Sequence, residues 1–244
     1  MNFAKTIVST LAAATLFGAQ PALADAITLD PGMIGQSYTI AFDGYSGGTT
    51  VDGLTSTATF KLTGTTGTSY TFDYVLTNST SSPLTSRVSS FAFNTDPNIA
   101  SANSTGAFSY TTLNSSYPNG IGAIDVCFKD AATGSCSGGG SGGLATGATG
   151  TGSLTLNFSQ PITSLTLSDF YVRYQSITGA GSISSASGSG TLTGSSGGTT
   201  TTTSGGTTST SSGGTAVPEP GMLGLLGGAV AALALVRRRR RIAA

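Results

Sequence analysis

Alternation of apolar and polar residues at every second position is the feature that most constrains how this chain of 244 residues can fold. Residues 54–62 alternate apolar or small side chains with threonine and lysine. In residues 70–77, one face carries Tyr70, Phe72, Tyr74 and Leu76. A period of two is typical of a β-strand with one buried face. Residues 63–67, between the two runs, have turn composition, so we predict a β-hairpin.

Six further segments have strand character and are separated by breaks rich in Gly, Pro, Asn and Ser. They are residues 37–42, 87–93, 107–113, 122–129, 153–158 and 163–174. No stretch between residues 25 and 178 shows helical periodicity. Eight or so short antiparallel strands predict an all-β fold, an antiparallel β-sandwich or jelly-roll, forming one domain over residues 25–178.

Residues 179–216 have a different composition, with 11 Gly, 11 Ser and 11 Thr among 38 residues and no charged or aromatic side chain. Such a segment buries too little apolar surface to offset its ordering entropy. We predict a disordered Gly/Ser/Thr-rich linker that spans roughly 31–37 Å as a flexible coil. Its hydroxyl groups are either O-glycosylation sites or part of a plain spacer.

The N-terminus carries an early positive charge at Lys5, an apolar stretch over residues 7–18, and small residues at Ala22 and Ala24. This pattern predicts a secretory signal peptide over residues 1–24, handled by the translocon and signal peptidase. The alternative is an N-terminal core helix. With cleavage after Ala24, the mature chain starts at Asp25, outside the cytoplasm.

Sixteen uncharged residues, 221–236, precede five arginines near the C-terminus. As a helix they extend about 24 Å, which spans a bilayer when the arginines snorkel, so we predict a single transmembrane helix. The arginines are Arg237, Arg238, Arg239, Arg240 and Arg241. The positive-inside rule keeps them cytoplasmic. The alternative is a nucleic-acid patch, but residues 25–216 hold four basic residues against nine aspartates, which argues against nucleic acid.

Val217, Pro218, Glu219 and Pro220 precede this helix. The order Val-Pro-Glu-Pro, short helix and arginine cluster over residues 217–244 resembles the PEP-CTERM sorting signal of Gram-negative bacteria. The resemblance implies an exosortase, an intramembrane cysteine transpeptidase that cleaves at Pro-Glu-Pro and releases the protein or transfers it to the surface. Pro218 and Pro220 restrict the residues before them to extended conformations, which suits a protease substrate.

The domain is also similar to the cistern-type group of PEP-CTERM proteins. The strings that carry this resemblance include Gly35-Gln36-Ser37-Tyr38, Asn94-Thr95-Asp96-Pro97 and Phe170-Tyr171-Val172-Arg173-Tyr174. The group implies a surface-exported β domain of unassigned activity and adds no catalytic residue.

The two cysteines, Cys127 and Cys136, flank eight residues that include Gly134. In an oxidising compartment a pair this close predicts a disulfide across a hairpin. The chain-entropy model gives such a loop about 2–3 kcal/mol of stabilisation. A metal site or a reactive thiol is the alternative, although no histidine or second cysteine pair accompanies them.

The chain contains no histidine, which excludes Ser-His-Asp and Cys-His catalysis and histidine-ligated metals. Asn94, Asp96 and Asn98 alternate as at the start of a calcium loop, but Ile99 and Thr105 stand where glycine and glutamate are expected. They form a calcium site or a plain Asx turn. Two aspartates facing each other would permit a glycosidase. Six aromatic residues are either a sugar-stacking row or core: Tyr70, Phe72, Tyr74, Phe170, Tyr171 and Tyr174.

Together these features predict an exported, non-enzymatic protein without a cofactor. We expect it to be held transiently at the inner membrane with its domain in the periplasm, then processed and delivered to the cell surface or an exopolysaccharide matrix. The alternative is a carbohydrate-binding or calcium-dependent adhesive module, which an exposed aromatic row or a cage of oxygen atoms would favour.

Overall fold

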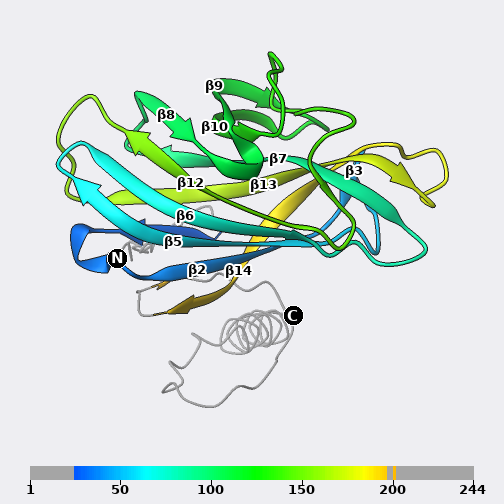
Figure 1. Cartoon of the computed structure of the whole chain (residues 1–244), viewed down its shortest axis with the longest axis horizontal. Coiled ribbons are helices and arrows are strands. Elements are labelled where there is room, and N and C mark those ends of the chain that lie inside the picture. Colours follow the sequence, from blue (N-terminus) through cyan, green and yellow to red (C-terminus); the bar gives the residue numbers. More distant parts are fainter. Residues whose placement is uncertain (1–24, 197–199, 202–244) are drawn as a thin grey trace, which may run out of the picture. The chain divides into compact units, whose positions relative to one another are not determined.

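The computed structural model describes residues 25–196 and 200–201, which form an all-β domain (Figure 1). Its strands form two antiparallel sheets. The first, here the β5 sheet, contains in spatial order β8 (Ser101–Ser104), β12 (Thr149–Asn157), β6 (Ser69–Asn78), β5 (Ser56–Thr66) and β2 (Ser37–Phe42). The second, here the β7 sheet, contains β13 (Leu165–Thr178), β7 (Thr85–Asp96), β10 (Gly122–Lys129) and β9 (Tyr110–Tyr117).

Strand β14 (Ala186–Ser196) joins the two sheets because it pairs with β13 over its first half and with β2 over its second half. Figure 1 shows this strand, in yellow, running into the β5 sheet beside β2. At the opposite edges β8 and β9 lie next to each other, and the Thr111 hydroxyl donates to the Ala102 carbonyl at 3.2 Å. The antiparallel sheet is therefore nearly closed, which confirms the predicted all-β class.

Short elements complete the described part of the chain. The strands are β1 (Ala26–Leu29), β3 (Tyr45–Ser46), β4 (Thr49–Thr50), β11 (Leu144–Ala145) and β15 (Thr200–Thr201). Two 3-10 turns, η1 (Pro31–Met33) and η2 (Gly106–Phe108), are the helices of this region. No helix among the described residues has the length and apolar character needed to cross a membrane.

The period-two pattern located most strands. Residues 37–42 and 122–129 form β2 and β10 with the predicted bounds. The predicted hairpin is β5–β6, but its turn is shorter, because a register shift between Leu62 and Gly64 lets β5 continue to Thr66. The prediction for residues 107–113 is displaced, since Phe108 belongs to η2 and the strand begins at Tyr110.

The predicted linker is wrong over its first half, because β14 and its Gly/Ser-rich sequence lie in the middle of the fold. The glycines fit there since they lack side chains. A Cβ on Gly190 would lie 2.6 Å from Ile40 Cγ2 and 2.8 Å from Phe170 Cβ. The ordered domain therefore extends past residue 178 to β15, and the remaining linker residues, 202–216, lie outside the described region.

The main core fills the space between the sheets with aromatic side chains. Phe60 of the β5 sheet lies 5.6 Å from Phe91 and 6.0 Å from Phe170 between ring centroids, and Phe91 stacks on Phe128 at 4.9 Å. Such aromatic pairs add about 0.5–1.5 kcal/mol each beyond their area burial. These residues face inward on alternate positions, which leaves the intervening residues for the outer faces.

Candidate binding site

The outer face of the β7 sheet, which points away from the main core, is covered by two parts of the chain. One is the end of the β9–β10 hairpin around residues 117–121, and the other is the loop that follows β10, residues 130–143. A second, smaller apolar cluster lies beneath them. It contains Ala92, Tyr117, Ile124, Cys127 and Cys136, with Ile121 and Tyr171 packed against it.

The hairpin end is fastened to the sheet by hydrogen bonds and ring contacts. Tyr117 lies with its ring centroid 5.7 Å from that of Tyr171, and its hydroxyl is 3.1 Å from Ser90 Oγ. The Ser187 hydroxyl donates to the Pro118 carbonyl at 3.2 Å, and the Asn119 amide donates to the Tyr45 carbonyl at 3.3 Å. The hairpin end is thereby held against β7, β13, β14 and β3 at once.

The loop after β10 is closed by the predicted disulfide. Cys127 and Cys136 are bonded, with 5.7 Å between their Cα atoms. Cys136 does not lie on a partner strand, as a cross-hairpin bond requires, but on the loop that returns over the sheet. Ser90 Oγ donates to the Cys136 carbonyl at 2.5 Å, and Ser89 Oγ donates to the Ser137 carbonyl at 2.7 Å. The disulfide therefore fixes a cover and not a hairpin.

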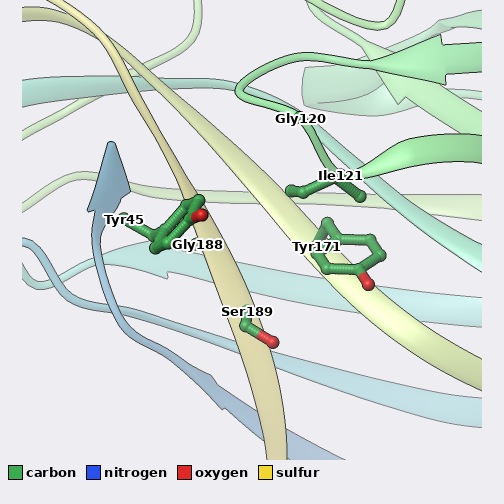
Figure 2. Close-up of a pocket in the computed structure, with 6 residues that line it drawn as sticks. All are labelled: Tyr45, Gly120, Ile121, Tyr171, Gly188 and Ser189. Atoms are coloured by element: carbon green, nitrogen blue, oxygen red, sulfur yellow. The ribbon is translucent and has the colours of Figure 1, made fainter. Parts of the chain in front are cut away.

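A pocket of about 230 Å³ opens beside the hairpin end (Figure 2). Its lining residues come from four places in the chain: Tyr45, Gly120, Ile121, Tyr171, Gly188 and Ser189. The rings of Tyr45 and Tyr171 stand on either side of β14 in Figure 2, with Ile121 above them. Gly188 is required at its position, since a Cβ there would lie 2.2 Å from the Asp43 carbonyl oxygen and 2.8 Å from Val172 Cγ2.

Carboxylates flank the pocket. Asp43 Oδ1 accepts from the main-chain N–H of Ser189 at 2.8 Å, and Asp169 Oδ2 accepts from the Asn94 amide at 3.0 Å. Burial raises the pKa of the Tyr171 phenol, and the nearby Asp169 charge raises this pKa further. The Tyr171 hydroxyl therefore stays protonated at neutral pH and remains a hydrogen-bond donor.

Two cations are buried on this face. Arg173 lies two residues beyond Tyr171 on β13, is 8% exposed, and has no hydrogen-bond partner for Nε or Nη1. Lys129 Nζ donates to Thr112 Oγ1 at 2.6 Å and to the Thr133 carbonyl. Burial lowers the pKa of both groups, and Tyr117 opposes this shift at Arg173. Both positive charges are thus withdrawn from the surface.

The predicted calcium residues do not form a loop. Asn94 and Asp96 belong to β7, and Asn98 follows them as an exposed residue. The Asn94 side chain accepts from the Asp125 N–H at 3.0 Å and donates to Asp169, so it ties β7 to β10 and β13. Within the described ranges no three acidic, cysteine or histidine side chains gather as a metal site would require.

Five of the six aromatic residues considered as a sugar-stacking row are core residues. They are Tyr70, Phe72, Tyr74, Phe170 and Tyr174. Only Tyr171 keeps a partly exposed ring, and its neighbour in the pocket, Tyr45, was missed by the sequence analysis. Tyr45 lies in a two-residue strand, which is too short for a periodic pattern to identify.

The sorting residues Val217, Pro218, Glu219 and Pro220, the five arginines, and the signal-peptide residues Ala22 and Ala24 lie outside the described region. Asp25 is the first described residue, and its carboxylate accepts from the Leu192 N–H of β14 at 2.8 Å.

The family described as the PEP-CTERM protein-sorting motif matches residues 216–241. This match includes the Val-Pro-Glu-Pro sequence, the apolar stretch and the arginines. The chain is therefore a PEP-CTERM protein, of the class that carries this sorting motif at its C-terminus. No curated protein and no solved structure matches the chain significantly.

Proposed function

We propose that this protein is a non-enzymatic cargo that an exosortase cleaves near Pro218–Pro220 and delivers to the cell surface or the extracellular matrix. The PEP-CTERM motif at residues 216–241 carries this proposal, because the motif implies export and transient membrane anchoring in Gram-negative bacteria. The translocon and signal peptidase act first, at the boundary between Ala24 and Asp25.

The extent of the folded domain supports cleavage at this position. The last described strand ends at Thr201, and the motif begins at residue 216. Between them the chain has 14 residues, 202–215. A protease at the membrane can therefore reach the Pro-Glu-Pro sequence without unfolding the domain.

The roles of the aspartates support a non-enzymatic domain. Most of their carboxylates accept hydrogen bonds that hold the backbone or join strands: Asp25, Asp30, Asp43, Asp125, Asp130 and Asp169. A carboxylate used in this way as an N–H acceptor serves the fold. A glycosidase needs two carboxyl groups free to act on one bond.

Intact mass and both termini of the protein, recovered from inner membrane, outer surface and medium, test this proposal. We expect a species that starts at Asp25 and ends near Pro218–Pro220 outside the inner membrane. A chain that still ends at Ala244 and stays in the inner membrane would contradict processing.

A pair of variants separates the motif from the domain. Replacing both Pro218 and Pro220 with alanine should leave the uncleaved chain in the inner membrane, because the variant lacks the prolines that favour extended conformations at the residues before them. Pro161→Ala, an exposed proline within the domain, is the control and should be processed as the wild type is. Unchanged processing of the double variant would show that the motif does not direct cleavage.

A further inference from the structure

We propose that the pocket between Tyr45 and Tyr171 binds one uncharged sugar ring, as the recognition site for a neutral polysaccharide. This inference goes beyond sorting and does not depend on it, because the pocket lies wholly within the domain. The walls, size, rigidity and surrounding charge of the pocket each suit such a ring.

The walls fit a sugar because they combine aromatic faces with a few polar groups. Tyr45 and Tyr171 present rings that can pack against the C–H faces of a pyranose, and Ile121 adds an apolar contact. Ser189 is exposed at the rim and offers a hydroxyl, while the exposed Gly120 leaves its backbone accessible. A mainly apolar pocket with few polar groups is typical of small-molecule sites.

The size selects a single ring. A volume of about 230 Å³ is at the small end for a ligand pocket, since such pockets typically hold about 300–1,000 Å³. A monosaccharide unit fits this space, whereas a dinucleotide or a folded peptide segment needs a larger pocket. A polysaccharide would insert one unit and extend along the surface on either side.

The pocket is built before a ligand arrives. Tyr171 is braced by Tyr117 at 5.7 Å between ring centroids, and the hairpin end that carries Gly120 and Ile121 is bonded to Ser187 and Tyr45. A site held in its binding conformation loses little entropy on association, which raises the affinity for a small ligand. The hairpin end that covers the β7 sheet thereby also holds the pocket in its binding conformation.

The charge around the pocket disfavours an anionic sugar. Asp43 and Asp169 lie beside the pocket, no cation lines it, and Lys129 and Arg173 on the same face are buried. A uronate or sulfated unit would approach carboxylates with no exposed cation to offset the repulsion. The structure therefore assigns the site to an uncharged sugar.

Saturation-transfer NMR of the full-length chain tests this assignment. The chain is kept in a zwitterionic detergent, because sugar-headed detergents would compete for the site. The probes are methyl glucoside, methyl galactoside, methyl mannoside and N-acetylglucosamine, with glucuronic acid as the charged comparison. We expect saturable transfer to at least one neutral probe and weaker transfer to glucuronic acid. The chain has no tryptophan, so quenching of tyrosine fluorescence gives a second reading.

Three variants locate the binding. Tyr45→Ala and Tyr171→Ala should each weaken binding at least about tenfold, a loss of about 1.4 kcal/mol. Ser189→Tyr fills the mouth of the pocket without removing a core contact and should block binding while the melting temperature stays unchanged. Tyr110→Ala, at a 46% exposed tyrosine on β9, is the matched control. Saturable binding of none of the neutral probes, tighter binding of glucuronic acid, or full binding by Ser189→Tyr would overturn the assignment.

Discussion

The outer face of the β5 sheet is open to solvent, whereas the outer face of the β7 sheet is covered by a hairpin end and a disulfide-closed loop. On the open face, threonines on neighbouring strands bond to each other: Thr39 to Thr59 at 3.0 Å, Thr71 to Thr155 at 3.1 Å, and Thr77 to Thr149 at 2.8 Å. On the covered face, the residues that point away from the main core include Ala92, Cys127 and Tyr171. In both sheets successive side chains point to opposite faces. Only in the β5 sheet do they alternate between the core and water; in the β7 sheet they alternate between the main core and the second apolar cluster.

The difference shows that alternation of apolar and polar residues predicts a strand but does not predict whether other parts of the chain cover its outer face. A threonine ladder satisfies its own hydroxyl groups and presents methyl groups to water, so it needs no cover. Apolar side chains on the outer side need one. Residues 88–93 of β7 are all buried because both faces of the strand are covered. Their sequence therefore does not alternate regularly between apolar and polar residues, as is typical of sheets covered on both sides. The cover should therefore contribute much more to the free energy of unfolding than the threonine ladder does.

Removal of the ring that anchors the cover should have the largest effect. Tyr117 is 2% exposed and packs against Tyr171, so Tyr117→Ala leaves a cavity beneath the hairpin end. We expect the free energy of unfolding to fall by about 3–5 kcal/mol, as for large aromatic residues in a core. Urea denaturation followed by tyrosine fluorescence measures this loss. A loss below 1 kcal/mol would mean that the cover is not part of the cooperative fold.

Removal of the disulfide is expected to come next. Replacing Cys127 and Cys136 together with alanine releases the loop after β10 and should lower the free energy of unfolding by about 2–3 kcal/mol. Reducing the wild-type protein should give a similar loss, and the reduced double variant is the control that should not change. If reduction has no effect on the denaturation midpoint, the cover is held by its hydrogen bonds alone.

Alkaline pH should reduce the stability of the covered face because Tyr117 is buried there. Burial is the largest cause that raises its pKa, so the folded state keeps the proton above about pH 10, where an unfolded tyrosine ionises. The stability that this group contributes is complete below about pH 10 and is lost as pH rises further. We expect Tyr117→Phe to be less stable at pH 7 and to lose stability less steeply above pH 10. An equally steep loss in the variant would assign the effect to other tyrosines.

Removal of the buried, unpartnered charge of Arg173 should stabilise the covered face slightly. Nε and Nη1 have no partner, and a methionine keeps most of the length of the side chain without the desolvated charge. We expect Arg173→Met to raise the free energy of unfolding by about 1 kcal/mol. A loss of more than 1 kcal/mol would show that the guanidinium has a partner in solution, such as an ordered water.

The smallest effect belongs to the open face. Replacing Thr77 and Thr149 together with valine removes the 2.8 Å hydroxyl contact but keeps the β-branched shape. We expect a change within about 0.5 kcal/mol, as for exposed positions away from special features. Thermal melting beside Tyr117→Ala gives the direct comparison between the two faces. A loss comparable to that of Tyr117→Ala would remove the distinction drawn here.

The sequence predicted those elements whose information is local. The bounds of β2 and β10 follow from alternation, and the Cys127–Cys136 bond follows from spacing. Strand β14 was missed because its Ser-Gly repeats have the composition of a linker, although the lack of side chains is what lets it fit between Ile40 and Phe170. The pocket was missed for a related reason: Tyr45 and Tyr171 meet only after β14 has brought together strands distant in sequence.

The position of β14 near the end of the domain also has a consequence for the order of events during export. Ser37 pairs with Ser196, 159 residues later, so β2 cannot form its pairing with β14 until almost all of the domain has been delivered. Non-local closure of this kind is slow. On the proposed export route, in which the chain crosses the translocon from its N-terminus, closure cannot be completed until residue 196 has emerged. The C-terminal sorting signal is then the part still held at the membrane. We expect the signal to keep each chain apart from its neighbours while the sandwich closes, which protects the unpaired edges of β2 and β13 from pairing with another copy.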